Sequence, residues 1–345
     1  MKPFMRVAVY YNNSDVRLEE IPTPQIGPDE ILVKVMASGI CGSDVLEWYR
    51  IKKAPLVLGH EIAGEIVQVG ENTKAVKVGD RVFVSHHVPC NQCRYCLSGH
   101  QTACETLHTT NFYPGGFSEY IRVPRINVEL GTYLLPDHLS YEDATFIEPL
   151  GCAIRGQRLA RIEPQHTLLV LGSGVAGLLH VQLARAHGGR RITATDISEY
   201  RSEAAKKFGA YAVIDGNDDV PSVLRQINEG RLADRVIVCT GALPAIHQAL
   251  RSVDRGGSIL FFAVPEPGND VTVPITKFWR NEITLMTSYG ASPKDLAQSL
   301  ELLSAKKIDV HEMITHRLSL TETGLGFRLV ADAKESLKVI VEPQR

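Results

Sequence analysis

Four cysteines, Cys90, Cys93, Cys96 and Cys104, lie close together in the chain with the spacing C-x2-C-x2-C-x7-C. Four thiolates on one short stretch are what a closed, tetrahedral structural zinc site requires. Turn-forming residues surround them, so we expect a small lobe at about residues 88–106 that the metal holds together. An iron–sulfur cluster and a nucleic-acid-binding zinc ribbon are the alternatives. The ribbon is disfavoured because Arg94 is the only cation near the cysteines at neutral pH.

A second set of possible metal ligands, Cys41, His60, Glu61 and Glu148, is spread over separate segments. Taken singly, Cys41 could be a small buried side chain, His60 a core histidine and Glu148 a surface acid. Together they offer sulfur, nitrogen and oxygen ligands. A catalytic zinc needs such a mixed set, with one position left for water or substrate.

A glycine-rich motif follows the expected strand Thr167–Leu171 and opens the expected helix Val175–His187. A G-x-G-x-x-G in this context predicts a turn that binds a dinucleotide, with the diphosphate at the positive N-terminus of the helix. The motif consists of Gly172, Ser173, Gly174, Val175, Ala176 and Gly177.

The choice of dinucleotide depends on Asp196, which comes nineteen residues after Gly177 at the end of the next apolar strand. A carboxylate there accepts hydrogen bonds from the ribose hydroxyls and repels a 2′-phosphate, which favours NAD over NADP. The alternative is that Asp196 only caps the following helix. Arg201 lies close enough to affect this preference.

The elements that must position these residues change in character near residue 150. Short alternating apolar segments separated by turns predict a β-rich, barrel-like first part; they are Val16–Ile21, Ile31–Ala37, Ile62–Val69 and Arg81–Ser85. Strands and helices then alternate, which predicts a parallel sheet covered by helices. The further strands are Ile192–Asp196, Ala212–Asp215, Arg235–Cys239 and Ser258–Val264, and the further helices are Ser198–Phe208, with Ser198 as a possible N-cap, and Pro244–Val253.

The composition fits a globular enzyme without a polyanionic or membrane partner. With 345 residues, two domains are expected. The net charge of −2 and the scattered Lys and Arg residues argue against nucleic-acid binding, and no apolar run approaches the ~20 residues that span a bilayer. The N-terminus lacks the pattern of a signal peptide, and clustered cysteines suggest metal rather than disulfides, so we expect a cytosolic protein.

Taken together, these motifs resemble the zinc-dependent medium-chain alcohol dehydrogenases, nearest the polyol (sorbitol-like) and threonine dehydrogenase branch. The resemblance covers essentially the whole chain. It rests on the Gly39–Asp44 motif, Gly59-His60-Glu61, the four cysteines, Glu148-Pro149-Leu150, Gly172–Gly177 and Cys239-Thr240-Gly241.

The resemblance implies an α/β fold with a GroES-like β-rich catalytic domain at residues 1–149, a Rossmann NAD-binding domain at 150–287, and a segment at 288–345 that completes the catalytic domain. In that tail we expect helices at Pro293–Lys306 and Glu322–Asp332 and strands at His316–Leu320 and Leu337–Val341. A homotetramer or homodimer is also expected.

The resemblance further implies two zinc ions per chain. Cys41, His60 and Glu61 are expected to surround the catalytic zinc, and Glu148 to be a fourth ligand or to hold the zinc-bound water. Ser43 is expected to hydrogen-bond the substrate oxygen and to pass its proton outward. The cofactor site should include Gly172–Gly177, Asp196, Ile197, Arg201, Cys239, Thr240 and Val264, although Cys239 and Cys152 have no role in zinc binding or catalysis by this match.

These features predict hydride transfer between NAD and a secondary alcohol, polyol or similar hydroxy compound. A threonine-type amino alcohol dehydrogenase is the alternative. A zinc-free quinone reductase is disfavoured by the ligand residues, and a non-catalytic homologue by their completeness. Leu46 stands where many relatives carry histidine, and only fourteen residues separate Asp44 from Gly59. This short segment, with Trp48 and Tyr49, predicts a wide entrance with aromatic walls and a preference for bulky or ring-bearing alcohols. In the other interpretation, Trp48 simply packs under the loop.

Overall fold

The computed structural model describes residues 2–345, which form two compact units. The first unit contains the described residues up to Gly151 together with Ala291–Arg345, and the second is Cys152–Gly290. Among the described residues, no helix is long and apolar enough to cross a membrane.

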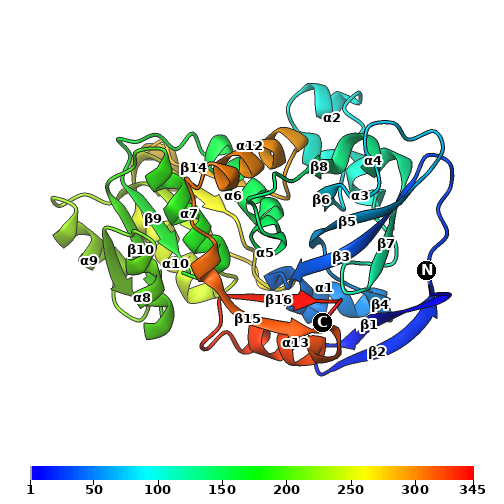
Figure 1. The fold of residues 1–345 in the computed structure, drawn as a ribbon. Helices are drawn as coiled ribbons and strands as arrows, with labels where there is room; N and C mark the ends of the chain where they lie inside the picture. Colours follow the sequence, from blue (N-terminus) through cyan, green and yellow to red (C-terminus); the bar gives the residue numbers. More distant parts are fainter. Residues whose placement is uncertain (1) are drawn as a thin grey trace. The chain divides into compact units, whose positions relative to one another are not determined.

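The first unit is built on a seven-stranded sheet whose main order is β15-β16-β3-β5-β6-β8, with β7 paired to β3. Its strands are β3 (Ile31–Gly39), β5 (Glu61–Val69), β6 (Arg81–Ser85), β7 (Tyr120–Val123), β8 (Thr132–Leu134), β15 (Ile314–Ser319) and β16 (Lys338–Glu342). The C-terminal strand β16 lies against β3, and this pairing joins the two ends of the unit (Figure 1). A smaller sheet has the order β2-β1-β4, formed by β1 (Phe4–Asn12), β2 (Asp15–Pro22) and β4 (Leu56–Val57).

Alternating apolar residues form the core beneath the larger sheet. Ile31, Val33 and Val35 of β3 point to the same face and are fully buried with Ile62 and Ile66 of β5, as the period of two in a strand requires.

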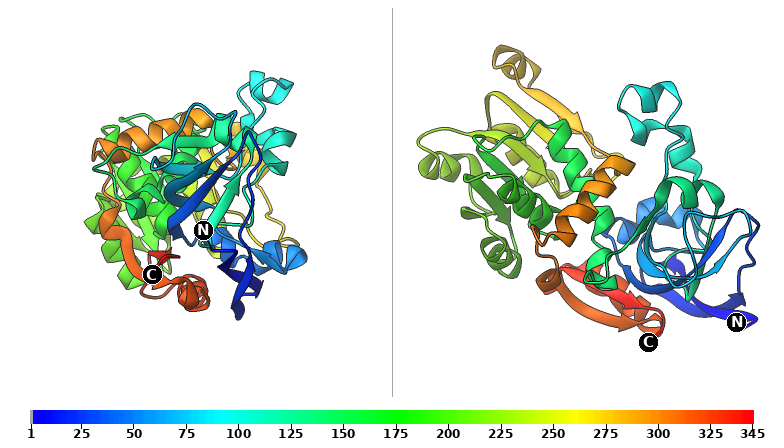
Figure 2. Two further views of the ribbon diagram at one scale, coloured as in Figure 1. Left: turned by 45° about the vertical axis from the view of Figure 1, so that its right-hand side comes forward. Right: turned by 45° about the horizontal axis from the view of Figure 1, so that its top comes forward.

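Helices of the first unit are mostly short. They are η1 (Gly42–Val45), α1 (Glu47–Arg50), η2 (Ile51–Lys53), α2 (Arg94–Leu97), η3 (Gln101–Ala103), α3 (Glu105–Thr109), α4 (Arg125–Gly131), α5 (Tyr141–Ala144), α12 (Pro293–Ser304), η4 (His311–Met313), η5 (Leu320–Glu322) and α13 (Thr323–Asp332). Helix α6 (Ile147–Leu159) contains the boundary at Gly151. The segment around α2 projects from the sheet of its own unit (Figure 2).

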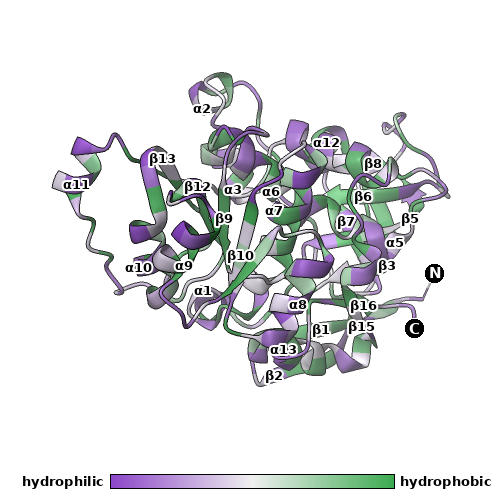
Figure 3. Ribbon diagram, turned by 90° about the vertical axis from the view of Figure 1, so that its left-hand side faces the viewer, coloured by the Kyte–Doolittle hydropathy of each residue, from purple (hydrophilic) through white to green (hydrophobic). Residues whose placement is uncertain are grey.

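The second unit has a six-stranded, entirely parallel sheet in the order β11-β10-β9-β12-β13-β14. Its strands are β9 (Leu168–Leu171), β10 (Ile192–Asp196), β11 (Ala212–Asp215), β12 (Ala233–Val238), β13 (Val253–Phe261) and β14 (Thr284–Thr287), and its helices, apart from the continuation of α6, are α7 (Val175–Ala186), α8 (Glu199–Lys207), α9 (Val220–Ile227), α10 (Leu243–Ser252) and α11 (Ile275–Arg280). The central strand β9 is wholly apolar and buried, and the adjacent β12 ends in three buried apolar residues (Figure 3). This is the order of a Rossmann-type doubly wound sheet, which confirms the predicted fold class.

Two expectations about elements were wrong in detail. Strand β13 begins at Val253 rather than Ser258 and ends at Phe261 rather than Val264. Its first half contains Gly256 and Gly257, so it carries too few apolar side chains to be recognised. The segment after Ser43, expected to be a loop, forms the short helices η1, α1 and η2.

Candidate metal centres and nucleotide-binding loop

The pairing of β3 with β5 brings Cys41, His60 and Glu61 together. These strands are antiparallel, with Gly39 opposite Glu61. Cys41 therefore follows the end of one strand at the edge where His60 precedes the start of the other. One ligand atom from each of the three residues lies within 4.8 Å of the other two.

Local hydrogen bonds fix the Cys41 side of this cluster. Cys41 is the N-cap of η1, where its Sγ accepts from the backbone N–H of Ser43 at 3.4 Å. The Asp44 carboxylate accepts from the backbone N–H of Cys41 at 3.1 Å, which completes a capping box. The other Asp44 oxygen lies 3.4 Å from Nδ1 of His60. Asp44 therefore fixes the His60 ring and leaves its second nitrogen for a metal, the usual work of a carboxylate behind a ligand histidine.

Charge also ties Asp44 to His60. Burial disfavours the charged form of His60, but Asp44 and Cys41 favour it more strongly and hold the His60 pKa well above its usual value. Burial opposes ionisation of Asp44 as well, yet His60 and Arg50 hold the pKa of its carboxyl below the usual range. A metal that binds this imidazole therefore competes with the proton that Asp44 and Cys41 favour.

Glu61 has a partner that sequence reasoning missed. Lys338 of β16 donates from Nζ to Oε2 of Glu61, and both side chains are only 1% exposed. A Cβ on Gly39 would collide with both groups, so a larger residue there would displace the ion pair. The sequence did offer a signal for this pair. Lys338 lies two residues before Ile340 on the same strand face, and Ile340 is fully buried.

Two histidines stand beside the cluster. His86 follows Ser85, which pairs with Glu61 across β5 and β6, so its ring centre lies 4.8 Å from that of His60. The ring of His87 lies 3.8 Å from that of His86. Burial, together with the neighbouring His60, lowers the pKa of His87 to about 4. His86 and His87 are therefore neutral, polar neighbours of the cluster at neutral pH.

Glu148 is not part of this group. It lies half-buried in the first turn of α6, outside the set formed by Cys41, His60 and Glu61. The three residues that do come together offer a thiolate, an imidazole and a carboxylate, a donor set that fits zinc with one open coordination position.

The four cysteines of the lobe also come together, with one sulfur from each within 4.8 Å of all the others. Cys93 and Cys104 are the N-caps of α2 and α3, and Asn91 and Gly99 take the positive φ angles that the turns need. The sulfur pairs Cys93–Cys96 and Cys90–Cys104 are 3.5 and 3.6 Å apart. These separations are close to the ~3.8 Å expected in a tetrahedron with zinc–sulfur bonds of about 2.3 Å.

The chemistry of the lobe fits a metal as well. Burial raises the pKa of the Cys96 thiol to about 12. At Cys104, burial opposes ionisation, but backbone hydrogen bonds outweigh it and lower the pKa to about 6. A cation among the four sulfurs would favour the thiolate form of each. Apart from the cysteines, Leu107 is the one side chain in the small apolar cluster of the lobe. A cluster of this size is a weak core, and a structural zinc would supply the missing stability.

In the second unit, the glycine motif has the geometry expected of a nucleotide loop. Gly172 directly follows β9 with φ +93°, and a Cβ on it would touch the backbone of Cys239 at 3.3 Å. Gly174 is the N-cap of α7. A Cβ on Gly177 would collide with the carbonyl of Gly172, so helix and strand pack closely only with glycine at this position.

Asp196 holds this loop in place. One carboxylate oxygen accepts from the N–H of Ser173 at 2.8 Å and the other from the N–H of Ser198 at 2.9 Å. Ser198, not Asp196, is the N-cap of α8, because its hydroxyl accepts from the N–H of Arg201. The alternative of Asp196 as the helix cap is therefore wrong. A carboxylate has about four acceptor positions, so two remain for ribose hydroxyls.

The other predicted cofactor residues lie near the same strand ends. Ile197 and Val264 are apolar yet 74% and 51% exposed, as expected of side chains that cover a planar ligand. Thr240 follows β12 and stands near Gly172. The backbone N–H of Cys239 donates to the carbonyl of Leu171, and burial raises the pKa of its thiol.

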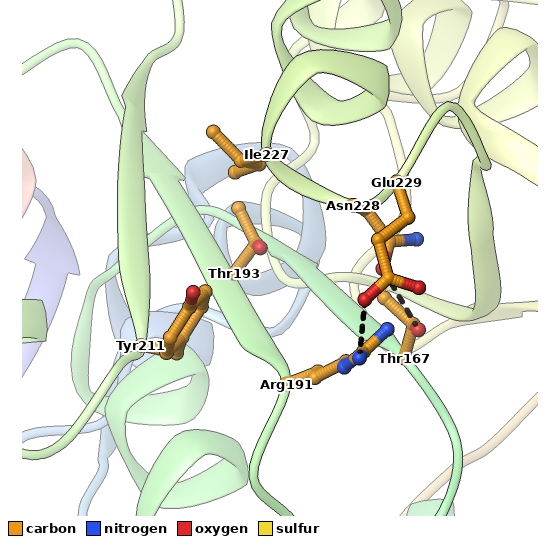
Figure 4. Close-up of a pocket in the computed structure, with 7 residues that line it drawn as sticks. All are labelled: Thr167, Arg191, Thr193, Tyr211, Ile227, Asn228 and Glu229. Atoms are coloured by element: carbon orange, nitrogen blue, oxygen red, sulfur yellow. Dashed lines mark hydrogen bonds and ion pairs between the residues drawn. The ribbon is translucent and has the colours of Figure 1, made fainter.

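A separate cavity of about 60 Å³ lies at the opposite ends of β9 and β10 (Figure 4). Arg191 and Glu229 form an ion pair of 2.7 Å beside it, and Thr167 donates to Asn228 at 3.3 Å. It accommodates only a few water molecules, and none of the predicted site residues lines it. Ligands of parallel sheets bind at the carboxyl ends of the strands, so this cavity is unrelated to the nucleotide loop.

Comparison with known proteins agrees with this geometry. The family profile described as alcohol dehydrogenase GroES-like domain matches residues 27–131, and the one described as zinc-binding dehydrogenase matches residues 176–305. The chain is 34% identical to sorbitol dehydrogenase of Bacillus subtilis (strain 168), over 99% of this chain and 98% of that protein. It is 35% identical to L-threonine 3-dehydrogenase of Caldanaerobacter subterraneus subsp. tengcongensis, over 96% and 95% of the two chains.

The fold has counterparts among solved structures. A zinc-binding dehydrogenase from Sinorhizobium meliloti 1021 bound to NADP superposes with a TM-score of 0.87 and 27% identity, over 99% of this chain and 100% of that chain. The GroES-like assignment of the first unit is thereby confirmed, as is the predicted family. The chain belongs to the zinc-dependent medium-chain alcohol dehydrogenases, in the branch of the polyol and threonine dehydrogenases, and is an oxidoreductase that uses zinc and a nicotinamide dinucleotide.

Proposed function

We propose that this chain transfers hydride between NAD and a secondary alcohol, polyol or similar hydroxy compound at a catalytic zinc held by Cys41, His60 and Glu61. The observation that carries the proposal is the convergence of these three donor types at one edge of the sheet. When bound, zinc supplies a Lewis acid for the substrate oxygen and NAD supplies the hydride acceptor.

The residues around the zinc divide the remaining work. Asp44 orients His60, and Lys338 holds Glu61. Ser43, whose hydroxyl lies 3.4 Å from Sγ of Cys41, donates a hydrogen bond to the substrate oxygen. Glu148 serves as an additional ligand or water partner when the site rearranges. Cys90, Cys93, Cys96 and Cys104 hold a second, structural zinc.

The diphosphate of the cofactor is expected to bind to Gly172–Gly177 at the start of α7. The two free acceptor positions of Asp196 bind the adenosine ribose, and its negative charge favours NAD over NADP. The first unit is then the catalytic domain and the second the NAD-binding domain.

The substrate is expected to be bulky or ring-bearing. Leu46 and Tyr49 are 37% and 36% exposed, and Trp48 is half-buried with its ring centre 5.7 Å from that of Tyr49. These exposed apolar surfaces support the interpretation as an aromatic wall over that of Trp48 as a core anchor, because aromatic faces pack on the apolar side of sugar or carbocyclic rings.

A panel of substrates tests this function. Ethanol, butane-2,3-diol, a cyclic polyol and L-threonine are each offered with NAD, and NADH is followed by absorbance with and without a zinc chelator. We expect the highest kcat/KM with the cyclic or branched secondary alcohol. L-Threonine as the best substrate would favour the amino alcohol dehydrogenase, which the similarity to an L-threonine 3-dehydrogenase supports. No NADH from any compound would contradict the proposal.

Assembly and location are part of the same proposal. We expect a homotetramer or homodimer, which sedimentation velocity would distinguish from a monomer. A cytosolic location is consistent with seven cysteines that are all free and with four of them in a metal-type cluster, since such thiols persist in a reducing compartment.

A further inference from the structure

Arg50, the last residue of α1, connects the two residues that stand behind the proposed catalytic zinc. Its Nη2 donates to Oγ of Ser43 at 3.0 Å, and its Nε donates to the backbone carbonyl of Ser43 at the same distance. The same Nη2 lies 3.4 Å from Oδ1 of Asp44. One guanidinium thus contacts both the serine beside Cys41 and the carboxylate beside His60.

The guanidinium is held firmly in this position. Its carbon lies 4.7 Å above the ring centre of Tyr49, and its side chain is only 14% exposed. The backbone N–H of Arg50 donates to the carbonyl of Leu46, the residue that precedes α1. Leu46 has no polar group, and the hydrogen bond to the Ser43 hydroxyl comes from Arg50 instead.

This contact decides the direction of the Ser43 hydroxyl. A serine hydroxyl has one hydrogen and two lone pairs, whereas a guanidinium only donates. With one lone pair accepting from Arg50, the hydrogen must point elsewhere, and Sγ of Cys41 lies 3.4 Å away as an acceptor. Ser43 is therefore oriented as a donor toward the metal ligands.

The contact with Asp44 acts on His60. Oδ1 of Asp44 is 3.4 Å both from Arg50 and from Nδ1 of His60, and Asp44 is fully buried. A buried carboxylate with two fixed partners has one orientation, so Arg50 also restricts the ring of His60.

We propose that Arg50 is a positioning residue for alcohol oxidation, which aims the Ser43 hydroxyl at the substrate oxygen and holds the Asp44–His60 pair in register with the zinc. The inference rests on the proposed function. A hydrogen bond from Ser43 strengthens as the substrate oxygen gains negative charge, so the contribution of Arg50 should fall mainly on kcat rather than on KM.

The test compares Arg50→Ala, Arg50→Gln and Arg50→Lys with the control Lys53→Ala. Lys53 is an exposed cation on the adjoining η2 whose ammonium lies 5.8 Å from the same Tyr49 ring, so its removal changes the local charge equally. We expect kcat to fall about 10- to 100-fold in Arg50→Ala and Arg50→Gln, the range for residues behind metal ligands, with KM changed less than about threefold. Arg50→Lys should recover part of kcat, and added methylguanidinium should partly restore Arg50→Ala.

A second readout does not depend on turnover. Release of the more labile zinc to a coloured chelator should be faster in Arg50→Gln than in wild type and in Lys53→Ala, since His60 is less restrained. If Arg50→Gln has the kcat and the rate of zinc release of the wild type, the inference is overturned. The Arg50→Gln variant provides this test even if Arg50→Ala fails to fold. Wild-type enzyme that reduces no NAD with any alcohol would instead refute the proposed function.

Discussion

At the scale of single residues, the structure depends on a few buried polar pairs whose members are far apart in sequence. Lys338 and Glu61 are both 1% exposed and pair across β16, β3 and β5. Burial of two charges costs free energy that their attraction only partly offsets, but removal of one partner leaves the other charge buried and alone. The position of Glu61 in the metal cluster is therefore tied to its lysine.

Replacement of Lys338 by methionine tests this dependence. We expect Lys338→Met to destabilise the protein by about 3–5 kcal/mol, as for other buried pairs that lose one partner, measured by chemical denaturation. Addition of Glu61→Gln in the double variant should recover part of this loss, since no uncompensated charge remains. Equal stability of Lys338→Met and wild type would show that the pair contributes nothing.

Asp196 carries the second prediction at this scale. Asp196→Ala should reduce the preference for NAD over NADP about 10-fold or more, because a charged hydrogen bond is worth roughly 1.5–3 kcal/mol and the repulsion of a 2′-phosphate disappears. Asp196→Asn is the matched control, since it retains an acceptor for the N–H of Ser173 or Ser198 but not the charge. The measurement is kcat/KM for both cofactors. Wild-type preference for NADP would point to Arg201 as the determinant.

The residues that sequence could predict are those whose chemistry is local. Gly172, Gly174 and Gly177 are recognisable because one turn requires all three. Arg50 and Lys338 escaped because their roles depend on contacts that no spacing reveals. Lys338 reaches Glu61 only through the pairing of β16 with β3.

At the scale of elements, the cysteine lobe is a segment with little stability of its own. Helices α2 and α3 have four and five residues, far shorter than an isolated helix needs. Their N-caps are the cysteines themselves, so the metal ligands also set where each helix begins. The lobe should therefore fold only around its ion.

Loss of one ligand tests this idea. Cys93→Ser should reduce the zinc content from two to one per chain and leave the segment between Cys90 and Cys104 open to proteolysis, because structural zinc contributes on the order of 10 kcal/mol to small zinc domains. Cys152→Ser, outside both clusters, should keep both ions and the wild-type digestion pattern. One zinc per fully active wild-type chain would contradict the two-site assignment.

The elements that could be predicted well from the sequence are those with a regular pattern of apolar residues and recognisable end residues. Strand β10 was predicted with its observed bounds, and α8 was found with its cap at Ser198. Strand β14, with four residues of mixed burial, and helix α9 went unrecognised. The position of β14 depends on its neighbour β13, because the strand itself has no distinctive local pattern. Helix α9 does have one, with a proline in its first turn and apolar residues at helical spacing, namely Val220, Val223, Leu224 and Ile227, so it could have been predicted from the sequence.

At the scale of the whole molecule, the main sheet of the first unit is completed by the C-terminal segment of the chain. Strand β16 pairs antiparallel with β3 and parallel with β15, and Gln344 donates to the carbonyls of Val35 and Glu119. The second unit contains its own sheet and nucleotide loop within Cys152–Gly290. The first unit therefore needs the C-terminal segment to complete its sheet, whereas the second unit contains no part of that segment.

Truncation after Glu335 should separate these needs. It removes β16, exposes the edge of β3 to solvent and leaves Glu61 buried without Lys338. We expect alcohol oxidation to be lost and the catalytic zinc to be released, while NAD still binds, as measured by the fluorescence of a bound dinucleotide. Deletion of Arg345 alone is the control, because it leaves Lys338 and Gln344 in place. A truncated chain that still oxidises alcohol would mean that the metal cluster forms without β16, and loss of NAD binding would mean that the second unit does not fold independently.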